Sequence, residues 1–566
     1  MNKIFRFATL FIVALITFSS YSQVQTVGTF TNKDDALDGY TLLFTLGSKN
    51  IHLINNCGQQ IKNWQTSTST LVAYLLPNGD VLKTGMDSTS PFSMGGQQGF
   101  LERYSWDGNL VWSYKLSDNQ MVLHHDIEML PNGNILVMAW RDLGDAEKRA
   151  TGRDSLAYDL NFPLWEEVIY EINPSVTQGA TIVWEWHSSD HLVQDIYPSM
   201  PNYGDVSSQK GKFNINYALE GAGNPADWLH FNSIDYNAGL DQIMISSLVF
   251  NEVFIIDHST TSAQSSGQVG GNGGKGGDIL YRWGNIEAYD KGTLSDKKSF
   301  GQHDAQWINY GPYAGNMLIF NNGNTRGYSS IDIINLPWDG LKYQMNASGT
   351  FGPDSAVYSY SKSPKTDLFS TFISGAEVLK NGNIILTEGA KGKITELRPD
   401  SNKIVWEYIN PVTTTGILKQ GEASGDNLCF RSYKYPTDYS AFDSKIISTG
   451  LPLELEPWPS GCNGIDTTRR DTLEDNDTTA FVYYPQVSNL QPTVFPNPSS
   501  GKIRFKSLAL ITSITISEPN GKVIYEEEVL KSDLIVDLSL HKSGLYFIQY
   551  KGKDFTKTAK LLLVRE

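Results

Sequence analysis

The sequence has few cysteines, histidines and charged residues for its length. Of 566 residues, three are cysteine and nine are histidine, and Asp, Glu, Lys and Arg together make up 19%. Hydrophobic residues account for 40% and aromatic residues for 12%. This composition excludes a disordered chain, and the length predicts a large core divided over more than one domain.

Beyond its N-terminus the sequence lacks an apolar run long enough to cross a membrane as a helix. The N-terminal stretch places Lys3 and Arg6 before an apolar run from Phe7 to Phe18, and small and polar residues follow. This three-part layout predicts a secretory signal peptide over residues 1–22, because the run is too short for a spanning helix. We therefore expect a soluble, exported protein with no spanning segment.

Positive charge is also scarce. The chain has 45 Lys and Arg against 61 Asp and Glu, a formal net charge of −16. An acidic surface repels phosphate backbones, and no basic patch with interleaved aromatic residues occurs in the sequence. Nucleic acid is therefore not an expected partner.

The three cysteines can form at most one disulfide, which export would permit. Cys57 in "NNCGQ" and Cys462 in "PSGCN" lie in turn-like sequence, whereas Cys429 lies in the apolar "LCF". We predict a disulfide between Cys57 and Cys462, with Cys429 buried as a small hydrophobic residue. Other pairings stay open, because sequence alone does not determine connectivity.

A polar stretch, "TTRRDTLEDNDTT", separates two parts of the chain and cannot support a packed core. We place a linker at residues 466–489, between a large domain at 23–465 and a small one at 490–566. The small domain contains alternating strand-like runs separated by Asn-Gly and Ser-Gly turns, which predict a β-sandwich.

Four stretches of the small domain carry a family resemblance: "FPNP", "PNGKVIY", "SGLYFI" and the basic, apolar "TKTAKLLLVRE". They resemble a type IX secretion C-terminal sorting domain. The resemblance implies that type IX machinery exports the protein across the outer membrane of a Gram-negative bacterium. The domain would then be removed or left at the cell surface. An appended carbohydrate-binding sandwich is the alternative.

The large domain contains internal repeats. The first repeat places an Asn-Gly hairpin turn between two apolar strands and occurs as "LLPNGDVLKTG", "MLPNGNILVMAW" and "VLKNGNIILTEG". The second repeat is a short strand-like run that occurs as "LVWSY", "IVWEW" and "IVWEY". Helical periodicity is lacking throughout. Repeated four-stranded units predict an all-β fold, a β-propeller for which we expect six blades, since each sheet needs a neighbour to cover its apolar faces.

One polar residue recurs at a similar distance before the hairpin glycines. His125 lies eight residues before Gly133, Ser374 eight before Gly382, His230 nine before Gly239, and His303 twelve before Gly315. At the start of an inner propeller strand, such side chains would converge on the central channel. A shared pocket is favoured over the alternative, in which each histidine satisfies only a local hydrogen bond.

Other chemistries have weaker support in the sequence. His125, His230 and His303 could supply three zinc ligands, so a metal-dependent hydrolase stays open. For His187 and His191 in "WHSSDHLVQD" we favour a structural loop over a metal site. The glycine-rich "GQVGGNGGKGGD" lacks the Ser or Thr and the helix of a phosphate-binding loop.

The stretches "HHDIEMLPNGNIL", "DWLHFNSIDYN", "FIIDHST" and "GQHDAQWI" carry a second resemblance. They resemble the bacterial arylsulfotransferase family over about Tyr40 to Trp458. The resemblance implies a six-bladed propeller that transfers sulfuryl groups from a phenolic sulfate ester to a phenol acceptor. It implies no metal and no organic cofactor.

The resemblance also assigns residues to roles. The transiently sulfurylated histidine falls on His303, and the second sulfuryl-contacting histidine, with an Asn two residues later, falls on His230 and Asn232. The earlier histidine falls on His125 or on His124. A hydroxyl contact would come from Ser374.

One position departs from the family pattern. An arginine expected eighteen residues after the second histidine is Leu248 here. Arg326 in "NNGNTR" could take its place as a donor to the sulfuryl oxygens. Weakened activity and a degenerate member both stay open, as does a non-catalytic secreted propeller that binds a glycan or a protein.

Overall fold

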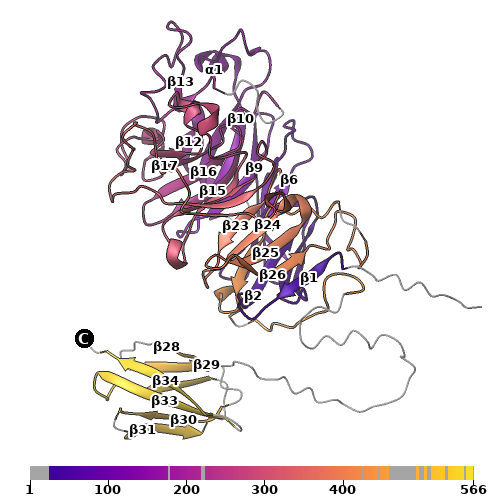
Figure 1. Ribbon diagram of the computed structural model, residues 1–566, viewed down its shortest axis with the longest axis vertical. Coiled ribbons are helices and arrows are strands. Elements are labelled where there is room, and N and C mark those ends of the chain that lie inside the picture. Colours follow the sequence, from indigo (N-terminus) through magenta and orange to yellow (C-terminus); the bar gives the residue numbers. More distant parts are fainter. Residues whose placement is uncertain are drawn as a thin grey trace, which may run out of the picture. The chain divides into compact units, whose positions relative to one another are not determined.

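The computed structural model describes residues 25–175, 179–217, 224–422, 425–443 and 445–457, and then 493–495, 502–506, 511–519, 521–528, 533–552 and 556–564. The chain divides into two compact units, Met1–Asp471 and Thr472–Glu566 (Figure 1). The predicted signal peptide, the linker at 466–489 and Cys462 lie outside the described residues. Cys57 is disulfide-bonded, and Cys429 is buried and free, as predicted.

Antiparallel sheets of four or five strands make up most of the described part of the larger unit. The first three sheets, in strand order, are β27 (Tyr433–Pro436), β2 (Gly39–Phe44), β3 (Asn50–Asn55) and β4 (Gln60–Gln65); β5 (Thr70–Leu75), β6 (Val81–Met86), β7 (Gly99–Tyr104) and β8 (Leu110–Lys115); and β9 (Met121–Met129), β10 (Ile135–Asp142), β11 (Trp165–Asn173) and β12 (Thr181–His187).

The next three sheets follow in chain order. They are β15 (Phe231–Asn237), β16 (Gln242–Ser247), β17 (Glu252–Asp257) and β18 (Tyr281–Trp283); β19 (His303–Trp307), β20 (Met317–Asn321), β21 (Ser330–Ile334) and β22 (Tyr358–Tyr360); and β23 (Gly375–Val378), β24 (Ile384–Glu388), β25 (Lys393–Arg398), β26 (Lys403–Ile409) and β1 (Gly28–Asn32).

Short elements lie outside these sheets. A two-stranded parallel ribbon joins β13 (Leu192–Val193) to β14 (Phe213–Asn214), and the α-helices described are α1 (Asp145–Ala150) and α2 (Ser262–Ser265). Single turns of 3-10 helix lie at Ser188–Asp190, Ile286–Tyr289, Leu294–Asp296, Gly311–Tyr313, Lys365–Asp367, Gly389–Lys391 and Ser440–Phe442.

The hairpin turns predicted from the Asn-Gly repeats are present. Gly79, Gly133 and Gly382 have φ values of 89°, 85° and 84°, a conformation that glycine adopts without a steric penalty. In each turn the glycine N–H donates to the carbonyl three residues earlier, at 2.8 to 2.9 Å. The repeated motif therefore sets the connection between the first and second strands of three sheets.

The sheets follow one another so that their first strands are neighbours. Contacts join β2 to β5, β5 to β9, β9 to β15, β15 to β19, and β19 to β23. The two ends of the domain close the arrangement, because β1 pairs with β26 and β27 pairs with β2. This is a β-propeller architecture, and the predicted all-β class is confirmed.

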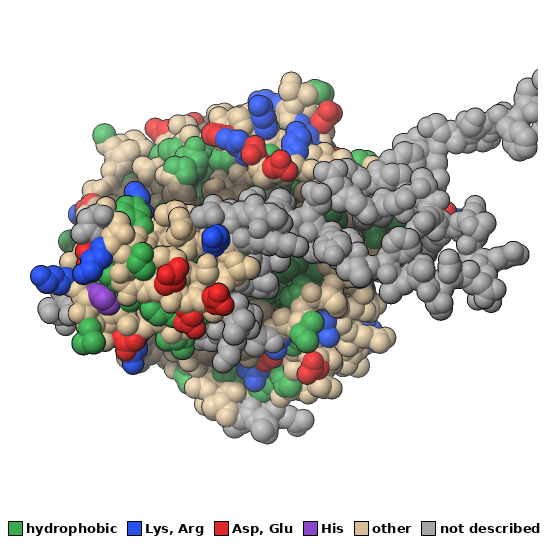
Figure 2. Space-filling model, turned by 90° about the horizontal axis from the view of Figure 1, so that it is seen from below, with side chains coloured by type: hydrophobic (Ala, Val, Ile, Leu, Met, Phe, Trp, Pro, Cys, Tyr) green, Lys and Arg blue, Asp and Glu red, His purple; other side chains and the backbone are tan. Residues whose placement is uncertain are grey.

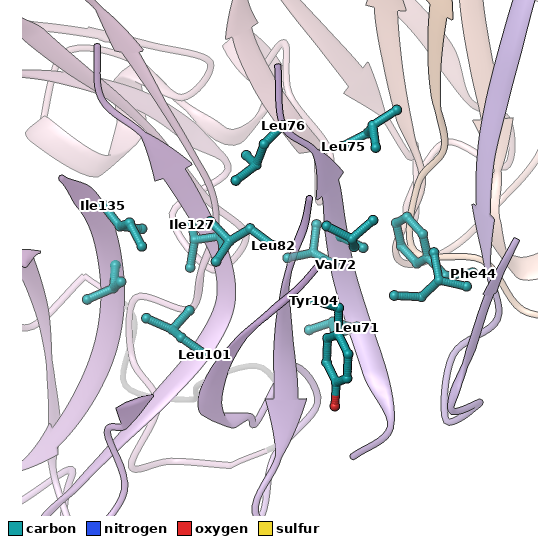
Figure 3. Close-up of a cluster of buried hydrophobic side chains, with 14 of the residues drawn as sticks. Phe44, Leu71, Val72, Leu75, Leu76, Leu82, Leu101, Tyr104, Ile127 and Ile135 are labelled. Atoms are coloured by element: carbon teal, nitrogen blue, oxygen red, sulfur yellow. The ribbon is translucent and has the colours of Figure 1, made fainter. Parts of the chain in front are cut away.

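Apolar side chains fill the space between adjacent sheets. In one cluster Phe44 of β2 and Leu71 of β5 lie near Leu101 of β7 and Ile127 of β9 (Figure 3). Because neighbouring sheets cover both faces, strands such as β5, β16 and β24 are buried along nearly their whole length. The packing of neighbouring sheets therefore fixes the positions of the inner strands.

The C-terminal unit holds two further sheets. One is β28 (Thr493–Phe495), β29 (Lys502–Lys506) and β32 (Asp533–Asp537); the other is β31 (Val523–Glu528), β30 (Ile511–Ser517), β33 (Gly544–Gly552) and β34 (Thr556–Leu563). Ile503 and Phe505 of the first sheet share one buried cluster with Ile516 and Ile548 of the second. The predicted pairing of two sheets over a common core is consistent with this cluster.

Among the described residues, no helix is both long and apolar enough to cross a membrane. On the face shown in Figure 2, acidic and basic side chains are interspersed with hydrophobic ones.

Candidate active site

Side-chain hydrogen bonds between neighbouring inner strands define which residues occupy equivalent places. The accepting and donating pairs are Asp126 with Ile234 N–H (3.2 Å), Ser233 with Ala305 N–H (2.9 Å), and Asp304 with Ala376 N–H (2.8 Å). In each pair a polar side chain of one sheet receives the amide of the next strand. These bonds therefore give a common register for the inner strands.

In this register His125, Asn232, His303 and Ser374 occupy the same place, each one residue before the register position. Asn232, and not His230, is the equivalent of His125. Counting back from Gly239 gave the wrong equivalence, because in the turn between β15 and β16 it is the Leu240 N–H that donates to the carbonyl three residues earlier, and Asn232 lies eight residues before Leu240. His230 lies just before β15 and adds a side chain that the repeat alone would not supply; the group formed by His125, His230 and His303 with Asn232 and Ser374 is called the pocket below.

The backbone is unusual at these places. His125 and His230 have φ values of 47° and 49°, Asp304 has 57° and Ser374 has 86°. Few residues other than glycine adopt this left-handed region, and such residues cluster at functional sites. The pairing of β9 with β10 and of β19 with β20 shifts at the same points, so bulges aim the side chains there.

His125 and His230 meet although they come from different sheets. Their ring centroids lie 4.7 Å apart at an interplanar angle of 78°. Trp140 of β10 lies 5.9 Å from the ring of His125 and 6.1 Å from that of His230. Gly96 covers the other side of His125, since a Cβ there would lie 2.0 Å from its Cε1.

His303 of β19 is held at one ring nitrogen. Its Nδ1 lies 2.9 Å from Asn322 Oδ1 and 3.1 Å from the Gly301 carbonyl. Both partners are acceptors, because the Asn322 amide nitrogen donates to the carbonyls of Ser370 and Ile373. Nδ1 therefore carries the hydrogen and Nε2 keeps its lone pair.

Burial lowers the pKa of His303 to about 3, so its imidazole is neutral near pH 7. Phe430 connects His303 with the other histidines. Its ring centroid lies 6.4 Å from that of His303 and 6.2 Å from that of His125. The three predicted histidines therefore surround a common region beside Phe430.

His230 differs in its electrostatics. Its Nδ1 lies 2.5 Å from Asp227 Oδ2, and its backbone N–H donates to the other oxygen of the same carboxylate at 3.1 Å. Burial lowers the pKa of His230, but the charge and hydrogen bond of Asp227 outweigh this and raise it above the usual value. His230 is thus suited to holding a proton.

His124 lies behind His125. Its Nδ1 is 3.0 Å from His125 Nδ1, its Nε2 is 2.8 Å from Glu167 Oε2, and its ring stacks on Trp140 at 4.1 Å. Burial lowers the pKa of His124 to about 3 and raises that of Glu167 well above its usual value. The neutral His124 therefore orients His125, which is the histidine beside His230.

The two remaining polar candidates are placed differently. Asn232 Nδ2 donates to the Gln302 carbonyl at 2.8 Å, while its Oδ1 is buried without a partner in the described structure. The Ser374 hydroxyl donates to Ser370 Oγ at 2.8 Å and accepts the Gly389 N–H at 3.0 Å. The Ser374 hydroxyl, which was expected to contact the substrate, thus has two structural partners, whereas Asn232 Oδ1 is available to accept a hydrogen bond from a ligand.

The structure does not bring Arg326 to the histidines. Its guanidinium donates to Ser330 Oγ at 2.6 Å and to the Asn321 and Tyr328 carbonyls, and it lies 4.4 Å from the Tyr328 ring. Leu248 donates its backbone N–H to the His230 carbonyl at 3.1 Å and contributes no charge. Arg326 therefore does not replace the arginine that the family pattern has at the position of Leu248.

A different arginine lies under the pocket. Arg431 Nη1 is 3.0 Å from Asp126 Oδ2 and 2.8 Å from Asp304 Oδ1, and its guanidinium lies 4.7 Å from the Phe430 ring centroid. Arg431, Asp227 and Glu167 were not predicted from the sequence. For Arg431 the available signal was a basic residue directly after an apolar stretch.

His187 and His191 have structural partners. His191 Nδ1 lies 2.8 Å from Asp278 Oδ1 and its Nε2 lies 2.8 Å from the Ser265 carbonyl, while His187 pairs with Glu166 at 3.0 Å. Within the described ranges, no group of three or more His, Cys, Asp or Glu residues is arranged to hold a metal ion.

The family model for arylsulfotransferase (ASST) matches residues 79–416, which include every histidine of the pocket. The chain belongs to the arylsulfotransferase family. A second model, the secretion system C-terminal sorting domain, matches residues 493–564. This arylsulfotransferase therefore carries a type IX sorting domain and is directed to secretion and the cell surface, as the two resemblances predicted.

No curated protein matches this arylsulfotransferase significantly. A protein of unknown function from Bacteroides caccae is similar at a TM-score of 0.36 and 12% identity, covering 66% of this chain and 93% of its own. The β-propeller domain of Cps50 (Swd1) from Myceliophteria thermophila gives 0.33 and 9%, covering 69% and 87%. A virginiamycin B lyase from Staphylococcus aureus gives 0.31 and 12%, covering 68% and 88%. Likeness at this level supports no argument about activity.

Proposed function

We propose that this arylsulfotransferase moves a sulfuryl group from a phenolic sulfate ester to a phenol acceptor in two displacements, through a sulfurylated His303. The observation that carries the proposal is the anchoring of His303. Its Nδ1–H is held between Asn322 Oδ1 and the Gly301 carbonyl, which leaves Nε2 as the nucleophilic nitrogen. A neutral, oriented imidazole is the form that can attack sulfur.

In the first displacement the Nε2–S bond forms as the ester S–O bond breaks, and the bonding electron pair leaves with the phenolic oxygen. The imidazole of His303 gains positive charge at this stage. Asn322 and Gly301 accept the Nδ1–H and stabilise that charge, because both acceptors are already in position. Their alignment before the reaction avoids reorganisation in the transition state.

His230 supplies the proton for the leaving phenolic oxygen. Asp227 raises the pKa of His230, so the imidazolium is available as a general acid. In the second displacement the acceptor phenol returns a proton to His230 as its oxygen attacks sulfur and the Nε2–S bond breaks. The proton balance closes over the two steps, and the enzyme returns to its starting state.

His125 supplies a neutral hydrogen-bond donor. Glu167, whose pKa is raised, donates to His124 Nε2, and His124 Nδ1–H then donates to His125 Nδ1. This chain leaves the hydrogen of His125 on Nε2. A sulfuryl transition state is loose and spreads charge over its peripheral oxygens, so His125 Nε2–H and His230 would stabilise it as donors.

Asn232 and Ser374 have supporting roles in the proposal. The unpartnered Asn232 Oδ1 can accept a hydrogen bond from the hydroxyl of the phenol acceptor as it binds, before that proton passes to His230. Ser374 holds the loop after β24 through Gly389 and helps to shape the pocket. Without an arginine at Leu248, the transition state loses a charged donor worth about 1.5–3 kcal/mol, so turnover is expected to be slow.

The test is transfer from a phenolic sulfate to a phenol by the wild-type chain and by His303→Ala. The wild type is expected to produce the sulfated acceptor, and mass spectrometry is expected to find one sulfuryl group on His303. His187→Asn is the control, because His187 is a half-buried histidine paired with Glu166 outside the pocket. Transfer that persists in His303→Ala would reject this nucleophile.

The other outcomes distinguish the alternatives. Absence of transfer with any phenolic sulfate would favour a propeller that binds a glycan or a protein. Loss of activity in the presence of a chelator would favour a metal-dependent hydrolase.

A further inference from the structure

The guanidinium of Arg431 joins the two inner strands that carry His125 and His303. It lies 3.0 Å from Asp126 on β9 and 2.8 Å from Asp304 on β19. The side chains of Arg431 and Asp304 are each 4% exposed and that of Asp126 is fully buried. An ion triad so well shielded from water is weakly screened and holds its geometry firmly.

Each aspartate directly follows a pocket histidine in the chain, Asp126 after His125 and Asp304 after His303. Each also accepts the backbone N–H of the neighbouring strand, from Ile234 or from Ala376. The left-handed φ of 47° at His125 and of 57° at Asp304 lies within these same dipeptides. Arg431 thus secures the two strained backbone positions that aim the imidazoles.

The position of Arg431 also carries an electrostatic effect. Its guanidinium lies 4.7 Å from the centre of Phe430, whose ring lies beside both His125 and His303. Burial is the main cause that lowers the pKa of each histidine, and the charge of Arg431 adds to it. This positive charge lies beneath a pocket that has Leu248 in place of the family arginine.

We propose that Arg431 is a positioning residue of the active site: through Asp126 and Asp304 it sets the aim of His125 and His303, and it places a positive charge beneath the anionic sulfuryl group. The proposal rests on the proposed function. Arg431 is not assigned a contact with the substrate, because Phe430 lies over its guanidinium.

Several titratable groups face this arrangement from the surrounding elements. The groups around the guanidinium are Asp126 of β9, Asp304 of β19, Tyr433 of β27 and Tyr74 of β5, and Glu128 of β9 and Asp235 of β15 lie beyond them. The groups around His125 and His303 are His124, His230 and Arg431 itself. Only Arg431 among them is a permanent cation, so its removal leaves the carboxylates unopposed.

The alternative explanation is that Arg431 contributes only to the stability of the fold. The chain offers a matched control in Arg282, which is fully buried and paired with the fully buried Glu252. Arg282 also donates to the carbonyls of Lys210 and Lys212, and neither these residues nor Glu252 belong to the pocket. Arg282→Met therefore removes a buried cation of the same kind at a site outside the pocket.

The experiment compares the full-length wild type with Arg431→Met, Arg431→Lys and Arg282→Met. One readout is the rate of the first displacement against pH, as phenol released in a single turnover. The second readout needs no activity: diethyl pyrocarbonate acylates neutral imidazoles, and mass spectrometry follows the acylation of His303 and His125 against pH. Both are normalised to the folded fraction measured by circular dichroism.

In Arg431→Met, the rate at pH 7 is expected to fall at least tenfold with little change in KM, because substrate contacts are kept. The pH midpoints of the rate and of acylation at His303 are expected to move up by a unit or more, since the loss of a cation and the unopposed carboxylates favour imidazolium. Arg431→Lys is expected to keep the wild-type midpoints but to react more slowly, because an ammonium lacks the planar geometry that places Nη1 against both carboxylates and Nη2 3.5 Å from the Asn232 carbonyl.

If Arg431→Met does not fold, the double variant Asp126→Asn with Asp304→Asn provides the test. It keeps the cation of Arg431 and weakens the ion pairs through which Arg431 joins the two inner strands. It is expected to slow the first displacement without raising either midpoint. Wild-type rates and midpoints in Arg431→Met or in the double variant would overturn the proposal. So would a loss that matches Arg282→Met with unmoved midpoints. Failure of the proposed function is distinguishable: the wild type would show no transfer, while the acylation midpoints would still report on Arg431.

Discussion

The ring centroids of His125 and His230 lie 4.7 Å apart, and the two imidazoles come from different sheets of the propeller. Their environments push their protonation in opposite directions. Burial lowers the pKa of His125 well below its usual value, whereas Asp227 raises that of His230 despite burial. Two histidines in contact can therefore hold different charges at neutral pH, which separates a hydrogen-bond donor from a proton carrier.

Gly96 leaves room for His125, and its replacement tests the aim of that ring. A Cβ at Gly96 would lie 2.0 Å from His125 Cε1, and the φ of 88° disfavours a side chain there. Gly96→Ala is expected to lower kcat at least about tenfold, because misplacing a reacting group by about 1 Å is enough to do so. Gly95→Ala is the control, since nothing lies within 4 Å of its Cβ position. Equal kcat values in the two variants would show that His125 tolerates displacement.

Asn322 tests the anchoring of His303. Asn322→Ala removes the acceptor of Nδ1–H at 2.9 Å, so the imidazole loses its fixed tautomer and part of its charge stabilisation. A loss of about 1–3 kcal/mol is expected, roughly fivefold to over a hundredfold in the rate of His303 sulfurylation. Asn321→Ala is the control, because Asn321 bonds Phe300, Lys298 and Asp332, none of which is a histidine. Equal effects in the two variants would count against the tautomer argument.

Much of the fold could be predicted from local sequence, because its signals act over a few residues. The Asn-Gly hairpins depend on glycine at positive φ, which Gly79, Gly133 and Gly382 show. The recurring Trp in the fourth strands marks the layer packed between sheets, as the burial of Trp112 and Trp406 illustrates. Both signals repeat along the chain, so a series of repeated antiparallel sheets could be predicted.

The pocket could be predicted only in part. The histidines stood out by their repeated place, but His230 lies two residues before Asn232, which holds the place shared by His125 and His303, because the turn after β15 places Leu240 where the other hairpins have glycine. Asp227, Glu167 and Arg431 reach the histidines from outside any repeat, so spacing gave no signal for them. Arg326 was chosen by charge alone, and its bonds to Ser330 and nearby carbonyls place it elsewhere.

Burial of neutral histidines predicts a loss of stability in acid. The pKa of His303 is lowered to about 3 in the folded state, so its contribution to stability is present above the unfolded pKa of about 6.5 and is lost as pH falls toward about 3. His303→Asn removes that dependence. Between pH 6 and 4 its free energy of unfolding is expected to fall less steeply than that of the wild type, by up to about 1.4 kcal/mol per pH unit. Urea titrations at several pH values would measure this, and parallel curves would contradict it.

Asp227 sets the basic limit of activity through His230. In Asp227→Asn the carboxylate charge that raises the pKa of His230 is gone, and burial alone then lowers that pKa. The imidazolium is lost at lower pH, so the basic limb of the pH–rate profile is expected to move downward. The effect should be largest for donors whose phenol is a poor leaving group, because those need the proton most. Asp278→Asn, beside His191, serves as control, and a shift of the same size there would contradict the assignment.

Restoring a cation at Leu248 tests whether its absence limits this enzyme. The Leu248 N–H bonds the His230 carbonyl, which places the residue beside the pocket. Leu248→Arg is expected to raise kcat at least about tenfold, because a guanidinium donates two hydrogen bonds to sulfuryl oxygens and hydrogen bonds to charged groups are worth about 1.5–3 kcal/mol. Leu248→Met, similar in length but uncharged, should leave kcat near the wild-type value. Arg326→Met should also do so, because its guanidinium bonds Ser330 and backbone carbonyls. A gain in kcat for Met equal to that for Arg would attribute the effect to shape and not to charge.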